Sequence, residues 1–242
     1  MQVYTDKETA GAAAARDAAE AMRQQAAGRD NIGVIFATGA SQMAMFGALT
    51  AVEGVPWEKV LGFHMDEYVD IQPDHPASFR RYLRERLTSR VPIGHFLGVD
   101  GNKDLDEECR YYTEALRSAQ PQLCLLGIGE NGHLAFNDPG EADFKDPADM
   151  KVVSLDDACR AQQVAEGWFP SLSEVPSRAL TLTIPALFRT KKLIVSVPGA
   201  RKAAIVRRTA LEPISTACPA TILRTHPDAT VYLDPDSAAE LP

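Results

Sequence analysis

Short hydrophobic runs alternate with amphipathic stretches along the chain. Nearly continuous apolar runs, typical of strands buried on both faces of a sheet, cover residues 31–37, 60–65, 123–129 and 193–197. Helical patterns cover residues 7–27, 42–52, 77–87, 105–119, 157–167 and 202–211. Further strands are predicted around Val152 and over residues 179–184 and 229–234. This alternation predicts one α/β domain over residues 1–242, with three αβα layers and a mostly parallel, Rossmann-like central sheet.

Composition and charge narrow the classes of partner. The chain has 242 residues, of which 45% are hydrophobic, and 33 acidic residues against 25 lysines and arginines give a formal charge of −8. This balance disfavours nucleic acid as a partner but allows a small bound anion. Charged residues interrupt every apolar run near the N-terminus, so we expect neither a signal peptide nor a membrane span of roughly 20 apolar residues. A cytoplasmic protein is the expectation.

Cysteine and histidine spacing gives no indication of a metal site. The four cysteines are far apart and form no CxxC pair, which favours reduced thiols. No pairing typical of metal ligands is found among His64, His75, His95 and His226. No bound metal is therefore expected.

The first candidate for chemistry is the turn that follows the strand at 31–37. Gly39, Ala40 and Ser41 stand between this strand and a helix, where small residues let backbone N–H groups approach an anion and the helix N-terminus adds positive potential. The turn lacks the lysine of a nucleotide P-loop, which disfavours nucleoside triphosphates. The alternative is a simple tight turn with Ser41 as a helix cap.

The second candidate is a pair of acids, Asp66 and Glu67, at the end of the strand at 60–65. A partly desolvated carboxylate has a raised pKa, which suits it to take a proton from carbon. Because neighbouring side chains of a strand point in opposite directions, only one of the two needs to face a cleft, and Asp66 is preferred. The alternative is that both acids cap the following loop or helix.

The third candidate is the glycine-rich segment 126–133. It contains GxGxxG after a strand, but Pro139 and Gly140 follow soon afterwards, where a dinucleotide fingerprint would require a helix. We interpret the glycines as bringing the backbone close to a small ligand and presenting His133, whose proton is mobile near neutral pH. A structural histidine is the alternative reading.

Two further residues fit the same picture. Asp138 lies in a turn five residues after His133 and can either hold the imidazole ring or form an Asx-turn with its own backbone. Lys202 opens a late helix, where a cation opposes the helix dipole unless an anion binds beside it. An exposed surface lysine is the alternative for Lys202.

Taken together, these motifs resemble the glucosamine-6-phosphate deaminase (isomerase) family, whose superfamily also holds 6-phosphogluconolactonase. The matching segments are residues 37–41, 63–69, 75–79, 126–140, 175–187, 199–203 and 226–234. The pairing of MDEY at 65–68 with GHLAFN at 132–137 is more specific than any single motif and favours the deaminase branch.

The resemblance implies a role for each matched residue. Asp66 would move a proton between C2 and C1 of an amino-sugar phosphate, and His133 would act as the acid that opens the ring. The phosphate would lie on residues 39–41 with Lys202. The substrate would be a small sugar phosphate, no cofactor would be needed, and a homo-oligomer is a further expectation.

The chain departs from the family pattern around the histidine. It has Asn131 where family members usually carry Asp, and Asp138 where they carry Glu. We retain both as candidate catalytic residues because these positions orient the histidine. The family's phosphate-binding arginine has no clear counterpart, and Arg160 is the candidate from the helix at 157–167.

Two alternative functions stay open. A phosphosugar lactonase would use His133 to activate water and would not need Asp66 for proton transfer. A non-catalytic sugar-phosphate sensor would keep Ser41 and Lys202 and could lose the catalytic acids. Because Asp66 and His133 are both present, and no helix-turn-helix segment or basic N-terminal patch is evident, an enzyme is preferred.

Overall fold

The central sheet of the protein is parallel throughout. The computed structural model describes residues 1–242. Seven strands form this sheet in the order β1-β10-β9-β6-β2-β3-β5, with every neighbouring pair parallel. Their bounds are Gln2–Val3 (β1), Ile32–Phe36 (β2), Val60–His64 (β3), His95–Leu97 (β5), Leu123–Leu126 (β6), Lys192–Ser196 (β9) and Ala229–Leu233 (β10). The predicted α/β class with a mostly parallel sheet is confirmed.

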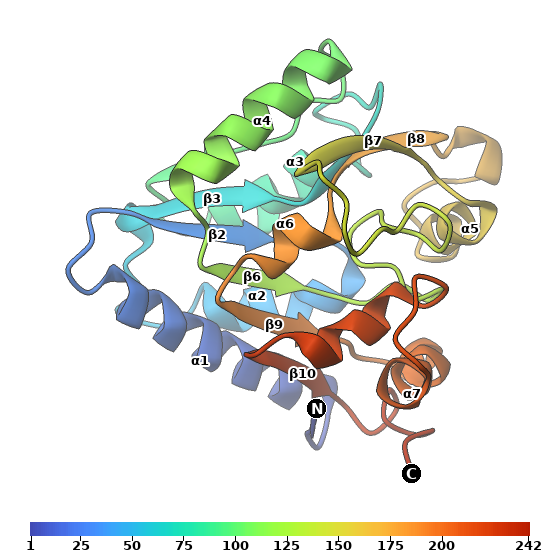
Figure 1. The fold of residues 1–242 in the computed structure, drawn as a ribbon. Helices are drawn as coiled ribbons and strands as arrows, with labels where there is room; N and C mark the ends of the chain where they lie inside the picture. Colours follow the sequence, from blue (N-terminus) through green and yellow to red (C-terminus); the bar gives the residue numbers. More distant parts are fainter.

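Helices cover both faces of this sheet, as Figure 1 shows with α1 and α4 on opposite sides. The helices are α1 (Lys7–Ala26), α2 (Met43–Leu49), α3 (Phe79–Leu83), α4 (Leu105–Ala119), α5 (Asp157–Ala165), α6 (Ile184–Phe188) and α7 (Ala203–Leu211). The predicted helix at 77–87 is α3 followed by a π-helical turn, Arg84–Thr88. The predicted helix at 42–52 is shorter, because α2 ends at Leu49.

Alternating side chains on the buried strands divide the core into two layers. Val34 and Phe36 of β2 pack with the alanine-rich face of α1, whereas Ile35 packs in the cluster that contains residues of α4, α6 and α7. Strand neighbours point to opposite faces, so a run that is apolar at every position can supply both layers. This is why the continuous apolar runs mark the central strands.

A small antiparallel sheet lies beside the main one and was not predicted. Its strands are β4 (Asp66–Tyr68), β8 (Arg178–Leu182) and β7 (Met150–Ser154), in the order β4-β8-β7. β4 begins two residues after β3 ends, so the apolar run at 60–65 continues into a second sheet. Asp66 therefore belongs to a short strand paired with β8 and is not the open end of β3.

The carboxyl ends of four adjacent strands form one edge of the main sheet. In Figure 1 the arrows of β2, β3, β6 and β9 point toward the side of the molecule where α5 lies. Each strand leads into one of the segments in which the sequence predicts chemistry: 37–41, 64–67, 127–133 and 198–202. Ligands of open α/β sheets bind at this edge. No helix of the structure has the length and apolar character required to cross a membrane.

Candidate active site

A single cleft at this edge brings most of the predicted site residues together. Its cavity has a volume of about 390 Å³, within the range of small-molecule sites. The predicted residues that line it are Gly39, Ala40, Ser41, Asp66, His133 and Lys202. Segments that are up to about 160 residues apart in the chain thus face one cavity, because parallel strands place their carboxyl ends side by side.

The turn after β2 is held in an unusual backbone conformation. Gly39 has φ of +95°, which a residue with a side chain adopts only with strain, and it leads through a short 3₁₀ turn into α2. The Ser196 hydroxyl donates to the Ser41 carbonyl oxygen at 2.9 Å, which ties this turn to β9. Gly127 packs against it so closely that a Cβ there would lie 3.0 Å from the Ser41 hydroxyl.

The turn after β9 repeats this geometry on the other side of β6. Gly199 has φ of +96° and leads through a 3₁₀ turn into α7, as Gly39 leads into α2. Both carboxylate oxygens of Asp234 accept a hydrogen bond from the Gly199 backbone N–H, at 3.0 and 3.1 Å. The two turns that begin at Gly39 and Gly199 and lead into α2 and α7 therefore both line the cleft, and Lys202 lies in the second of these turns.

Lys202 is buried without a carboxylate partner. It is 8% exposed and lines the cavity, and no acidic oxygen lies within 4.0 Å of its ammonium. Burial lowers its pKa, and the nearby charges of Glu166 and Glu130 offset part of this effect. A buried lysine that keeps its charge needs an anion. The cleft supplies the space for one beside the Gly39 turn.

Asp66 faces the same cavity from β4. It is 6% exposed, lines the cleft, and accepts no hydrogen bond from any protein donor. Burial, and secondly the charge of Glu67, raise the pKa of Asp66 well above its ordinary value. A carboxylate in this state is a stronger base than a solvated one, as proton abstraction from carbon requires.

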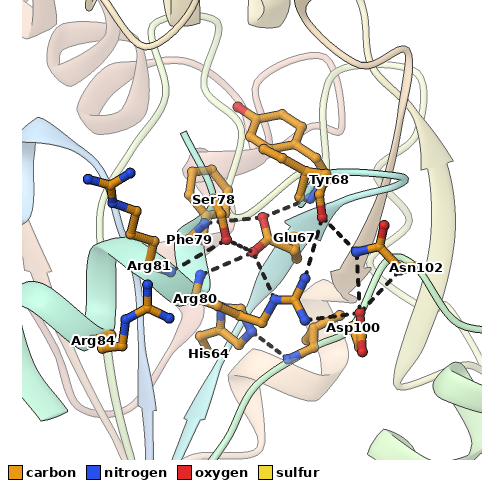
Figure 2. A network of polar contacts seen from close by, with 12 residues as sticks. His64, Glu67, Tyr68, Ser78, Phe79, Arg80, Arg81, Arg84, Asp100 and Asn102 are labelled. Atoms are coloured by element: carbon orange, nitrogen blue, oxygen red, sulfur yellow. Dashed lines mark hydrogen bonds and ion pairs between the residues drawn. The ribbon is translucent and has the colours of Figure 1, made fainter. Parts of the chain in front are cut away.

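Glu67 points the other way and has a structural role, which agrees with the expectation that only one acid of the pair faces the cleft. Figure 2 shows its carboxylate at the centre of a polar network. It accepts from the Ser78 hydroxyl at 2.8 Å and from the backbone N–H groups of Tyr68, Phe79 and Arg80 at 3.0–3.1 Å. The last two belong to the first turn of α3, so Glu67 caps this helix.

The glycine-rich segment after β6 shapes the environment of His133. A Cβ on Gly129 would lie 2.2 Å from the imidazole, so the ring packs directly on the backbone at this glycine. Gly132 has φ of +94° and forms the turn that brings His133 back to Gly129, whose N–H donates to the His133 carbonyl at 3.0 Å. No helix follows, which fits the rejection of a dinucleotide fingerprint.

Asp138 and Asn131 orient the imidazole. Nδ1 of His133 lies 2.9 Å from Oδ1 of Asp138, and the Asn131 side-chain amide donates to the same oxygen at 2.9 Å. The side-chain oxygen Oδ1 of Asn131 accepts from the His133 backbone N–H at 3.0 Å, and the side-chain amide of Asn131 also donates to Asp156 at 3.3 Å. Neither Asn131 nor Asp138 lines the cleft, so both lie behind the histidine.

This arrangement gives a physical reason for asparagine at position 131. An aspartate there would stand beside Asp138 and Asp156 as a third carboxylate, whereas the amide donates to both. Burial raises the pKa of Asp138, but hydrogen bonding and charge from His133 outweigh burial and leave it below the ordinary value. Asp138 is therefore an ionised partner of the ring at Nδ1.

One cluster behind the site has the side chains of a metal site. His133, Asp138 and Cys159 each offer a ligand atom, and these atoms lie within 4.8 Å of one another. Burial raises the pKa of the Cys159 thiol, with the charge of Asp138 as the next contribution. Without a bound ion, the cluster is therefore a histidine–aspartate pair with a neutral thiol beside it.

The structure does not place Arg160 in the cleft. Its guanidinium donates to the backbone carbonyls of Leu172 and Val175, at 2.7 and 3.1 Å, and pairs with Asp157 at 3.2 Å. These contacts join α5 to the segment that follows it. The next turn of α5 lines the cavity and Arg160 does not, so phosphate binding by Arg160 would require this side chain to leave its present contacts.

Several cleft residues were missed from the sequence. α5 and the residue after it contribute Gln162, Gln163 and Glu166. Their spacing of three and four residues is the signal that could have identified a common helix face. The other charged residues missed are Lys7, Glu130 and Arg201.

The fold and the cleft define a class of protein: an α/β protein with a cleft at the carboxyl edge of its parallel sheet, lined by the turn at Gly39, a buried lysine, a buried aspartate and a histidine. Residues 5–232 match the family model described as glucosamine-6-phosphate isomerases/6-phosphogluconolactonase. The chain belongs to this family.

Individual relatives agree with this assignment. The chain is 33% identical over 213 residues to a glucosamine-6-phosphate deaminase of Geobacillus sp. (strain WCH70), covering 85% of this chain and 83% of the relative. It is 33% identical to glucosamine-6-phosphate deaminase 1 of Bacillus subtilis (strain 168), covering 80% of each chain.

Solved structures show the same fold. One described as a monomeric glucosamine-6-phosphate deaminase superposes with a TM-score of 0.89 at 29% identity, covering 99% of this chain and 100% of that one. A 6-phosphogluconolactonase from Trypanosoma brucei superposes with a TM-score of 0.79 at 20% identity, covering 100% of this chain and 98% of that one, which is a likeness of fold.

Proposed function

We propose that the protein converts a 2-amino-2-deoxyhexose 6-phosphate, either glucosamine 6-phosphate or an epimer, into the ketose 6-phosphate and ammonia. The observation that carries the proposal is that an unpaired buried lysine, a desolvated aspartate and an oriented histidine face one cavity. The activity of the deaminase relatives supports the same reaction.

Binding begins at the phosphate. The N–H groups of the turn led by Gly39 and the ammonium of Lys202 hold the dianion, and the hydroxyl of Ser41 adds a donor. Because this group is remote from the reacting carbons, its binding energy fixes the sugar relative to Asp66 and His133.

His133 acts first, as the acid that opens the pyranose. The imidazolium donates a proton to the ring oxygen while the C1 hydroxyl loses its proton to water, which gives the open-chain aldehyde. Asp138 stabilises the charged imidazole through the 2.9 Å contact at Nδ1, so the other ring nitrogen is the one that serves the substrate.

Asp66 then moves a proton along the chain of the sugar. Its carboxylate takes the proton from C2 while the aldehyde oxygen gains a proton from water, which forms an enolamine. Asp66 then returns its proton to C1, and the nitrogen loses a proton to water, which forms the 2-imine. Water adds to C2 and ammonia leaves, so one water is consumed and one ammonia is released for each ketose phosphate formed. Every step is a proton transfer, the addition of water or the elimination of ammonia, and the acid and base of this site can assist each of them.

The test is a panel of three substrates with the purified protein. Ammonia and acid release are measured separately with glucosamine 6-phosphate, galactosamine 6-phosphate and 6-phosphogluconolactone. Ammonia from one of the amino sugars, with ketose phosphate in equal amount, is the expected result. Acid release from the lactone, without ammonia from either amino sugar, would assign the protein to the lactonase branch. Release from none of the three would favour a sugar-phosphate sensor.

A further inference from the structure

The carboxylate of Glu166, at the end of α5, is held in position on the wall of the cleft. The side-chain amide of Gln162 donates to one carboxylate oxygen at 2.7 Å, and the indole N–H of Trp168 donates to the other at 3.1 Å. Gln162 in turn accepts from the backbone N–H of Glu130 at 3.0 Å, which anchors it to the loop after β6. Both carboxylate oxygens are thus fixed by neutral donors.

A chain of contacts links this carboxylate to the proposed phosphate turn. The Tyr82 hydroxyl donates to the Gly39 carbonyl oxygen at 2.8 Å. The Tyr82 ring meets the Trp168 ring edge to face, with centroids 6.1 Å apart, and Trp168 holds Glu166. Gly39 and Glu166 line the same cavity, so the acid is positioned relative to the turn by rigid aromatic groups.

Glu166 and Lys202 both line this cavity, and neither forms an ion pair. No lysine, arginine or histidine nitrogen lies within 4.0 Å of the Glu166 carboxylate, and Lys202 also forms no ion pair. The charge of Glu166 nevertheless acts on Lys202, since it offsets part of the effect by which burial lowers the pKa of this lysine. The two groups are close enough to interact but are kept apart.

A carboxylate at this place is unfavourable for binding a phosphate dianion, because like charges repel most strongly where water is excluded. This cost is offset if the ligand brings a hydrogen-bond donor to the same carboxylate, and a hydrogen bond to a charged acceptor is stronger than one between neutral groups. Sugar hydroxyls near the phosphate are such donors, whereas the phosphate dianion has none.

We propose that Glu166 is a specificity-determining residue that accepts a hydrogen bond from a hydroxyl of the sugar near its phosphate, and that it selects polyhydroxylated phosphate monoesters over phosphate groups without hydroxyls. The proposal rests on the proposed function, since it places the phosphate on the Gly39 turn and Lys202. It assigns Glu166 to the site that the candidate Arg160 does not occupy.

The test uses two inert ligands and isothermal titration calorimetry. Methyl phosphate carries the dianion without a hydroxyl, and sorbitol 6-phosphate carries the same dianion with hydroxyls; both are titrated at about pH 8, where the monoester is fully ionised. The variant Glu166→Gln keeps the shape of the side chain and removes its charge. Glu114→Gln is the matched control, since Glu114 is exposed on α4 and outside the cleft.

We expect opposite effects on the two ligands. Glu166→Gln weakens sorbitol 6-phosphate binding about tenfold through loss of a charged acceptor. The same variant tightens methyl phosphate binding about threefold through loss of repulsion. Glu114→Gln leaves both unchanged. Tighter binding of both ligands would show that Glu166 only repels the phosphate, and weaker or unchanged binding of both would show a structural role; either result overturns the proposal.

A further variant tests how Glu166 is held, and the use of ligands that do not react separates failure of this proposal from failure of the proposed reaction. Trp168→Phe keeps an aromatic ring at this place but removes the N–H donor to Glu166, so we expect a smaller change in the same direction for sorbitol 6-phosphate. Because neither ligand reacts, the contrast between them does not depend on ammonia release. If Glu166→Gln has the expected opposite effects on the two ligands but the unaltered protein releases no ammonia, only the proposed reaction is overturned. Failure of the unaltered protein to bind either ligand would overturn the phosphate site and this inference with it.

Discussion

Two neighbouring groups of charged residues lie on the two sides of β4, and they differ in whether the protein supplies partners for their charges. Behind β4, Glu67 accepts four hydrogen bonds and lies 3.5 Å from the Arg80 guanidinium, which also pairs with Asp100 at 2.9 Å (Figure 2). In front of β4, Asp66 and Lys202 line the cleft without a hydrogen bond or an ion pair from the protein. Adjacent positions of one short strand thus carry a fully paired acid and an unpaired one.

The difference distinguishes structural charges from functional ones. A buried charge is tolerated when it is paired and hydrogen-bonded, and Glu67 meets both conditions. An unpaired buried charge costs stability, and it persists where binding or catalysis needs it. The comparison predicts that substitutions behind β4 lower stability, whereas substitutions in front of it lower activity and preserve or raise stability.

The sharpest test of this contrast is Asp66→Asn. Loss of the base should reduce ammonia release from the amino-sugar phosphate, measured as kcat, by about 1,000-fold. It should also stop exchange of the C2 hydrogen with deuterated water, followed by NMR. Because the pKa of Asp66 is raised in the folded state, its ionised form destabilises the fold at neutral pH, so the melting temperature should rise. Unchanged aldose-to-ketose conversion would contradict the role of Asp66.

On the other side of β4, Glu67→Ala should act mainly on stability. It leaves the Ser78 hydroxyl and the first turn of α3 without their acceptor, so the free energy of unfolding in urea should fall by about 3 kcal/mol. Glu85→Ala is the control, because Glu85 forms an exposed pair with Arg81 and its removal should leave the urea midpoint nearly unchanged. Equal stability of the two variants would refute the assignment of Glu67 to the fold.

Lys202→Met should weaken binding while sparing the fold. Loss of the ammonium should raise KM for the sugar phosphate about 30-fold. The melting temperature should not fall, because a buried lysine without a partner is replaced by an apolar side chain of similar length. Lys192→Met is the matched control: Lys192 pairs with Asp228 at the opposite end of β9, and KM should stay the same. A drop in kcat without a change in KM would remove Lys202 from the binding site.

The pH dependence of kcat/KM should show the shifted pKa values of Asp66 and Lys202. Asp66 acts as a base, so activity should rise about tenfold per pH unit on the acid side until the raised pKa of Asp66 is passed. Lys202 must be protonated to bind phosphate, and its lowered pKa should bring the alkaline fall below the ordinary range for lysine. Lys202→Met should lose this alkaline limb. Persistence of the limb in the variant would assign it to another group.

The inner strands of the main sheet could be predicted from the sequence because they are buried on both faces, whereas its two edge strands, β1 and β5, were not predicted. Apolar side chains on both faces are typical of central strands, and such runs contain Val34, Phe63, Leu125 and Val195. The small sheet was not predicted as a separate unit, because β4 follows β3 with one residue between them and both read as one run. Its pairing with β8, more than 100 residues later, depends on tertiary contacts that local patterns do not contain.

Some residues of the candidate site could be predicted from the sequence, and others could not. Residues in glycine-containing turns, such as Ser41 and His133, could be found because strand, turn and chemistry are contiguous in sequence. Glu166 could not be found, since an exposed-looking glutamate near the end of a helix gives no sign that the helix lies over the cleft. Arg160 was chosen by residue type, but packing determines which face of α5 points to the cavity, and Arg160 lies outside the cleft.

The smallest predicted effect on activity concerns this arginine. Arg160→Ala should change KM for the sugar phosphate by less than about twofold, because the guanidinium does not reach the cleft. It should lower the free energy of unfolding by about 1 kcal/mol through loss of the hydrogen bonds to Leu172 and Val175. Steady-state kinetics and urea unfolding on the same preparation give both values. If KM rose as far as in Lys202→Met, Arg160 would have to leave these carbonyls and enter the cleft when substrate binds, and α5 would then supply a cation as well as the carboxylate of Glu166.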